Sequence, residues 1–190
     1  MRSTLIDSVY ILAFAVLTGL AAAVKLPFMP YHPITAQIIV VLLSGALLGS
    51  FRGPMSQLVF VALGLAGLPL FRDLAPGYPA PAFGASPEFI RVGLKVGWLQ
   101  GFVAASYVTG VTLEYARSTD FRACAIAVFG GVATIYICGV AFPVLVLRAP
   151  LTSGFLSWLW PFLGMDLLKA LLALLFLANI NRFRRLELLA

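Results

Sequence analysis

Long apolar runs dominate this sequence and limit what the chain can fold into. Six of them are separated by breaks rich in proline, glycine or arginine, and they cover residues 8–24, 34–48, 55–71, 93–113, 123–147 and 162–180. A helix needs roughly 20 mostly apolar residues to cross a bilayer, and these runs are of about that length, the second and third being short. The sequence therefore predicts an all-α integral membrane protein built as a bundle of six transmembrane helices.

Composition supports a membrane protein with a single domain. Of the 190 residues 62% are hydrophobic and 11% charged, whereas a soluble domain is about half apolar and about a quarter charged. Six spans with their loops fill the length, so we expect one membrane domain over residues 1–190. The net charge of +6 comes from basic residues scattered at predicted helix ends. This pattern favours contact with anionic headgroups of the lipid bilayer and indicates no nucleic-acid partner.

Lysines and arginines in the loops predict the orientation. Six spans place both termini on one side, which would carry seven basic residues: Arg2, Arg52, Arg117, Arg122, Arg182, Arg184 and Arg185. The other side would carry four: Lys25, Arg72, Arg91 and Arg148. Because cytoplasmic loops carry the excess of basic residues, we predict a multi-pass protein of the plasma membrane with both termini in the cytoplasm.

Two opposite charges interrupt the last apolar run. Asp166 and Lys169 are three residues apart, so they share one face of a helix. Counted from Pro161, they lie about 8 and 12 Å along the axis, in the outer half of the bilayer. Ionisable residues inside a span are costly and usually face a partner or a cavity. They predict a binding site for a small molecule with an anionic end and N–H donors; the alternative is a pair that only holds the bundle together.

Other polar residues are predicted near the same side of the membrane. Lys95 could supplement Lys169, or its side chain could extend to the headgroups. Thr35 and Gln37 open the second run, where they could line the site, or Thr35 could instead cap the helix.

Small residues and missing motifs complete the prediction from the residues alone. Ala15, Gly19 and Ala23 recur every four positions, a pattern that allows close helix contact in lipid, either within the bundle or with another subunit.

The chain has no G-x-x-x-x-G-K-[ST] phosphate loop, no converging Ser/His/Asp set and no Cys/His metal spacing. We therefore expect no enzyme activity, no metal and no cofactor in this chain.

Several motifs then match a known family. The stretch from His32 to Phe71 contains a P-[IV]-T-x-Q opening, an LLxGxxLG helix, a basic turn and a GLAGLPxF ending, and the last run contains "PFLGMDLLK". Together these resemble the BioY family, the biotin-specific S components of energy-coupling-factor (ECF) transporters, whose final motif is similar to PFLPGDLLK. The chain departs from the family at "GLKVGW", where GPTGGY is usual, so that Trp98 stands where a tyrosine is expected.

The resemblance implies a function and a set of partners. An S component of this type captures biotin on the outer side and delivers it inward with an ECF transmembrane coupling subunit and two ATPase subunits, which use the ATP. Lys169 would pair the biotin carboxylate and Asp166 a ureido N–H, or the two charges could exchange these roles through a bridging water. Further ligand contacts would come from Thr35, Gln37, Trp98 and Lys95, and the stripe of Ala15, Gly19 and Ala23 looks like the docking surface for the coupling subunit. The alternatives are a self-sufficient carrier for biotin or a related carboxylate, with Asp166 as its proton group, and a purely structural or lipid-binding membrane protein.

Overall fold

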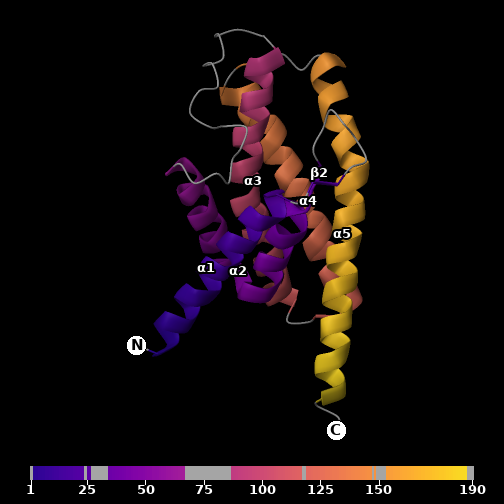
Figure 1. Ribbon diagram of the computed structural model, residues 1–190. Coiled ribbons are helices and arrows are strands. Elements are labelled where there is room, and N and C mark those ends of the chain that lie inside the picture. Colours follow the sequence, from indigo (N-terminus) through magenta and orange to yellow (C-terminus); the bar gives the residue numbers. More distant parts are fainter. Residues whose placement is uncertain are drawn as a thin grey trace.

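The computed structural model describes residues 2–23, 25–26, 34–66, 87–116, 119–146, 148 and 153–187. They form an almost entirely helical fold (Figure 1). The elements in chain order are α1 (Arg2–Ala23), β1 (Lys25–Leu26), β2 (Ile34–Thr35), α2 (Gln37–Leu65), α3 (Pro87–Ala116), α4 (Phe121–Ala141), the π-helix η1 (Phe142–Val146) and α5 (Ser153–Glu187).

Within these residues, five helices are long and apolar enough to cross a membrane. The all-α prediction is confirmed, whereas the count of six spans is not established by the described part of the chain. The numbers five and six differ because α2 combines the predicted run 34–48 with most of the predicted run 55–71. Residues 67–71 of that second run lie outside the described ranges.

A sharp reversal divides α2 into two arms. Gly49 has non-helical backbone angles (φ 85°, ψ −178°), and a positive φ of this size favours glycine. Across it, Gln57 Nε2 donates a hydrogen bond to Ser44 Oγ at 3.1 Å although the residues are 13 apart. In a straight helix they would be about 20 Å apart, so the arms fold back as a hairpin. Pro54 lies inside the second arm, five residues after Gly49.

The second helix begins later than the sequence predicted. Ile34 and Thr35 pair antiparallel with Leu26 and Lys25 as a two-stranded sheet, and the helix starts at Gln37 after the N-cap Ala36. The prediction that the helix starts at residue 34 is therefore wrong. The β-branched side chains of both residues favour the extended conformation, and the pairing with β1 fixes it.

The remaining helices extend past the predicted runs. α1 begins at Arg2 rather than residue 8, α3 at Pro87 rather than 93, and α5 covers Ser153–Glu187 rather than 162–180. The added ends of α1 and α3 and the last turns of α5 carry charged residues, which a hydropathy pattern leaves out. At the start of α5 the prediction placed Pro161 in the first turn, whereas Pro161 lies inside the helix. The run 123–147 changes at Phe142 from α-helix to π-helix, next to Pro143, whose missing N–H removes an α-helical hydrogen bond.

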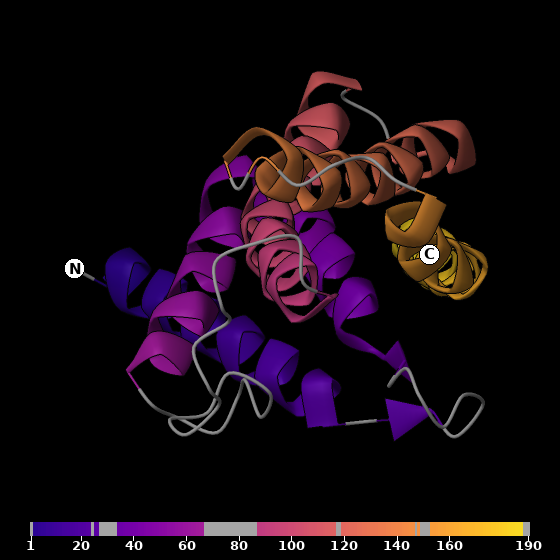
Figure 2. The ribbon, with the colours of Figure 1, turned by 90° about the horizontal axis from the view of Figure 1, so that it is seen from above.

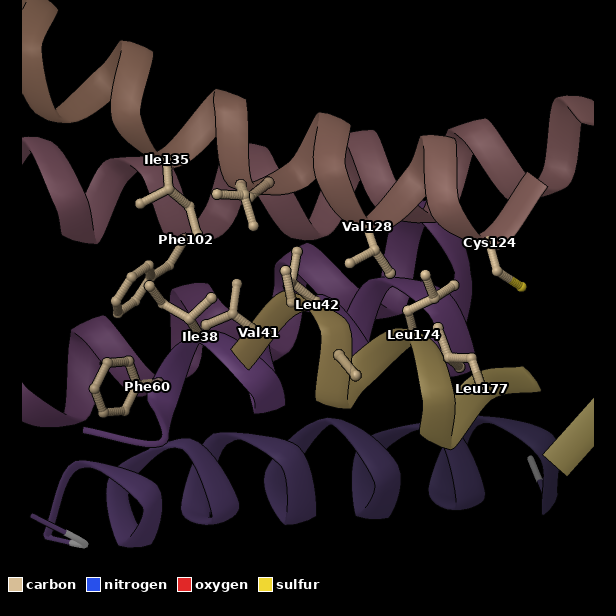
Figure 3. Close-up of a cluster of buried hydrophobic side chains, with 14 of the residues drawn as sticks. Ile38, Val41, Leu42, Phe60, Phe102, Cys124, Val128, Ile135, Leu174 and Leu177 are labelled. Atoms are coloured by element: carbon tan, nitrogen blue, oxygen red, sulfur yellow. The ribbon is translucent and has the colours of Figure 1, made fainter. Parts of the chain in front are cut away.

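Apolar side chains from all five helices meet in one core (Figure 3). Leu42 of α2, Phe102 of α3 and Leu174 of α5 lie there together with Val128 and Ile135 of α4. Seen from above, α5 lies at one edge of the bundle, and α1 flanks α2 (Figure 2). Contacts of α5 with α4 and α2 attach it to the rest. The inner face of α5 therefore determines what its two charges meet.

Candidate functional site

The inner face of α5 carries both charges. Asp166 and Lys169 are 4% and 5% exposed, and they continue a buried stripe that also contains Ala170, Ala173 and Leu174. The opposite face exposes large apolar side chains: Leu167, Leu168, Leu171, Leu172, Leu175 and Phe176. The helix thus presents leucines outward, as a lipid-facing surface requires, and directs its acid and its amine into the protein.

The two charges form an ion pair. Lys169 Nζ lies 2.7 Å from Asp166 Oδ1, and both side chains are 6% exposed. A buried pair adds little net stability, because the cost of removing two charges from water offsets their attraction, whereas removing one partner is costly. The pair is therefore weak evidence for a stabilising role and calls for a functional explanation.

A tyrosine that sequence reasoning did not select completes the cluster. Tyr136 of α4 donates a hydrogen bond from its hydroxyl to Asp166 Oδ2 at 2.7 Å. Among the described residues each carboxylate oxygen therefore has one donor, Lys169 of α5 for Oδ1 and Tyr136 of α4 for Oδ2. The available signal was that Tyr136 is the only tyrosine of the run 123–147 and stands at its middle, away from the interfaces where tyrosines in spans usually gather.

Trp98 of α3 adjoins this cluster. Its ring packs edge-to-face on Phe162, with centroids 5.2 Å apart and planes at 76°, and Phe162 lies one turn before Asp166 on α5. On the other side the indole contacts Gly139, where a Cβ would overlap Trp98 Cδ1 and Nε1. Gly139 lies one turn after Tyr136 on α4. The indole is thus between α4 and α5 on the same helix faces that carry Tyr136 and Asp166.

Unused hydrogen-bonding capacity at this site consists mainly of donors. An ammonium group has three N–H donors, and within the described part of the chain Lys169 Nζ bonds only to Asp166. Trp98 Nε1 is buried and has no hydrogen-bond partner among the residues that the structure describes. Buried polar groups are nearly always paired, so these donors suit a ligand that brings acceptor oxygens. No group of metal-binding side chains occurs among the residues that were described.

Thr35 and Gln37 bond to each other. Thr35 Oγ1 donates to Gln37 Oε1 at 3.1 Å, and both residues are half-buried at the start of α2, which contacts α5. The N-cap is Ala36, without a side-chain cap, so the capping alternative for Thr35 is wrong. In the described ranges no hydrogen bond joins either residue to the ion pair. Lys95 belongs to α3, one turn before Trp98, and its side chain lies outside what the structure describes.

The small-residue stripe of α1 faces the protein interior. Ala15 is fully buried and belongs to the core, and Gly19 is buried as well, where α1 packs against α2. The side chain of Ala23 lies outside the described set. For Ala15 and Gly19 the structure thus shows the alternative of packing within the bundle. A docking role for this pair stays a prediction that requires α1 to separate from α2.

The helical arrangement matches that of a solved membrane transport protein. The chain is similar to the crystal structure of the S-component for biotin from an ECF-type ABC transporter, with a TM-score of 0.70 over 95% of this chain and 93% of that one, at 22% identity. The fold is therefore that of an S component. A family model described as "BioY family" matches residues 1–185, and the chain belongs to the BioY family.

Curated relatives agree with this assignment. The chain is 32% identical to the biotin transporter BioY of Rhodobacter capsulatus over 94% of this chain and 93% of that protein. It is 35% identical to the probable biotin transporter BioY of Lysinibacillus sphaericus, over 74% of this chain and 65% of that protein. This is a family of transporter components rather than of enzymes.

Proposed function

We propose that this chain binds biotin in the membrane and serves as the substrate-binding subunit of an ECF-type uptake transporter. The buried Asp166–Lys169 pair is the observation that carries the proposal, because Lys169 keeps two N–H donors without partners in the described part of the chain. The names of its relatives and of the similar solved structure, all biotin transport proteins, give the ligand.

Biotin brings the groups that this site lacks. Its ureido carbonyl and its valerate carboxylate are acceptors for Lys169 and for Trp98 Nε1. Its ureido N–H groups can bond to Asp166, because an ionised carboxylate has about four lone-pair sites and the described residues occupy two of those on Asp166. The sulfur ring can pack on the Trp98 indole. Further contacts would come from Thr35 and Gln37 and from Lys95.

The proposal includes partner subunits. The similar solved protein is an S-component of an ECF-type ABC transporter. This sequence contains no phosphate loop of its own, so ATP hydrolysis would come from two ATPase subunits joined through a transmembrane coupling subunit. Biotin would enter from the outer side, with both termini of this chain in the cytoplasm. Protease accessibility of tags at both ends in sealed vesicles tests this orientation.

Titration of the purified chain with biotin tests the site. Losing one partner of a hydrogen-bonded charge pair costs about 2–5 kcal/mol, so Lys169→Ala and Asp166→Asn should each weaken biotin binding roughly 30-fold or more. Arg122→Ala, which removes an exposed charge, is the matched control and should bind as the wild type does. Unchanged affinity in both site variants would remove the pair from the site.

The runner-up function is a self-sufficient proton-coupled carrier. It would use Asp166 as the proton group, since this carboxylate is buried inside a span. The two functions differ in their energy source. In cells that hold ATP constant, collapse of the proton gradient should stop uptake by a carrier and leave ECF-driven uptake unchanged. Uptake that ceases with the gradient would favour the carrier and contradict the partner-driven proposal.

A further inference from the structure

Tyr136 is the residue outside α5 that, in the ranges described, hydrogen-bonds to the Asp166–Lys169 pair. Its bond joins α4 to α5 across 30 positions of sequence. Tyr136 is half-buried and packs against the apolar core, so the hydroxyl is held in place by the ring beneath it. Within the described part of the chain, the Asp166 carboxylate is thus held by two donors from two helices, one on each oxygen.

Because the two Asp166 oxygens bond to different residues, the number of Lys169 N–H donors that Asp166 occupies depends on Tyr136. The terminal torsion of an aspartate is broad, so a carboxylate with a single partner can rotate. With Tyr136 on Oδ2, only Oδ1 is directed at the ammonium, and one of its three N–H donors is used. Without the tyrosine, the carboxylate can turn both oxygens toward Lys169 and occupy a second donor.

We propose that Tyr136 is a positioning residue for ligand binding. By holding Oδ2, it restricts Asp166 to one donor of Lys169 and leaves the other two for an acceptor oxygen of the ligand. The tyrosine acts through Asp166 and does not itself contact the ligand. This inference rests on the proposed function, since it concerns the same site.

A double-mutant cycle tests the coupling. In Tyr136→Phe the ligand must displace a second hydrogen bond between Asp166 and Lys169, and competition with a bond between charged groups should weaken biotin binding roughly tenfold or more. In the Asp166→Asn background the same change should alter affinity less than about twofold, because the charged acceptor is gone. Tyr107→Phe, on the exposed side of α3, is the matched control and should bind normally in both backgrounds.

Other outcomes of the cycle overturn the inference. Equal losses in both backgrounds would show that the tyrosine acts by packing or by contacting the ligand directly. Wild-type affinity in Tyr136→Phe would show that the bond does not position the pair. Neither result contradicts the proposed function, which fails separately if the wild type does not bind biotin or if Lys169→Ala leaves binding unchanged.

An infrared measurement decides the matter without ligand. The antisymmetric carboxylate stretch of Asp166 is isolated as the band that disappears in Asp166→Asn. Loss of the Tyr136 bond should shift this band in Tyr136→Phe and leave it unchanged in Tyr107→Phe. A band at the wild-type position in Tyr136→Phe would overturn the inference. If Asp166→Asn binds biotin too weakly to titrate, the infrared band alone tests the inference.

Discussion

Two buried polar clusters lie in this bundle, and they differ in how completely their hydrogen bonds are used. One is the Asp166–Lys169–Tyr136 cluster described above. The other, which we call the Gln57 cluster, consists of Thr18, Ser44, Ser56, Gln57 and Ser106 and joins α1, both arms of α2, and α3. All five of its side chains are fully buried.

The Gln57 cluster satisfies itself. Gln57 Nε2 donates to Thr18 Oγ1 at 3.2 Å and to Ser44 Oγ at 3.1 Å, and Ser44 Oγ lies 2.8 Å from Ser106 Oγ. The hydroxyls of Thr18 and Ser44 also reach the backbone carbonyls of Phe14 and Val41. Polar side chains joined across helices in this way fix packing in lipid, so this cluster has a structural role.

The charged cluster has the opposite character. It holds two full charges, and Lys169 has unused donors within the described part of the chain. A cluster retained for packing should be saturated, and a cluster retained for binding should have capacity left for its ligand. The comparison therefore assigns stability to the Gln57 cluster and ligand affinity to the charged cluster, and each prediction below tests one side of that division.

The largest expected effect is on stability when half of the ion pair is removed. Lys169→Met leaves Asp166 as a buried charge with one neutral donor, and breaking such a pair costs about 3–5 kcal/mol. Replacing both residues by Leu and Met should recover most of that loss but leave biotin binding abolished. Unfolding in detergent and biotin titration measure both effects. A double variant that still binds biotin would contradict the division.

A second test displaces Trp98. A Cβ at Gly139 would overlap the indole, so Gly139→Ala must move the ring, at a cost of about 1–3 kcal/mol in stability, and should weaken biotin binding. Gly130→Ala on the same helix is the matched control, because among the described residues a Cβ there meets only Val108, at the ordinary contact distance of 3.8 Å. If both variants bind biotin equally well, Trp98 is not part of the site.

The sequence predicted the charged cluster better than the Gln57 cluster, for a physical reason. Charges in a span are rare and costly, so Asp166 and Lys169 were evident, and their spacing placed them correctly on one buried face. Ser, Thr and Gln are tolerated in spans, so Gln57 and Ser106 carried no comparable signal. Their pairing depends on the reversal at Gly49, which brings Ser44 next to Gln57.

Long-range pairing also limited what could be predicted at the site. Tyr136 reaches Asp166 only because α4 packs beside α5, and nothing in the run 123–147 indicates that partner. Thr35 could be expected to cap a helix, yet its pairing with Lys25 in the two-stranded sheet moves the helix start to Gln37. Local patterns thus predicted the helices and the buried face, whereas contacts between helices required the structure.

A smaller effect is expected in the Gln57 cluster. Gln57→Leu removes the hydrogen bonds that join the second arm of α2 to Thr18 of α1 and to Ser44 of the first arm. Thr18 and Ser44 keep their backbone acceptors. Because hydrogen bonds between membrane helices contribute on average about 0.6 kcal/mol each, we expect a loss of about 1–2 kcal/mol in unfolding free energy. Biotin affinity should remain at the wild-type value; a drop comparable to that of Lys169→Ala would show that the two clusters are not separate in function.

The smallest effect is predicted at the exposed end of the bundle. Arg52 Nη2 lies 3.1 Å from Asp7 Oδ1, and the two side chains are 47% and 32% exposed. This ion pair links the second arm of α2 to α1. Exposed ion pairs contribute about 0–1 kcal/mol, so Arg52→Ala should lower the unfolding free energy by less than about 1 kcal/mol and leave biotin affinity unchanged. Removing the basic residue should therefore affect the two ion pairs unequally. The remaining Asp7 is hydrated by water, whereas the remaining Asp166 is a buried charge without compensation. A stability loss at Arg52 equal to that of Lys169→Met would contradict the claim that burial determines the difference.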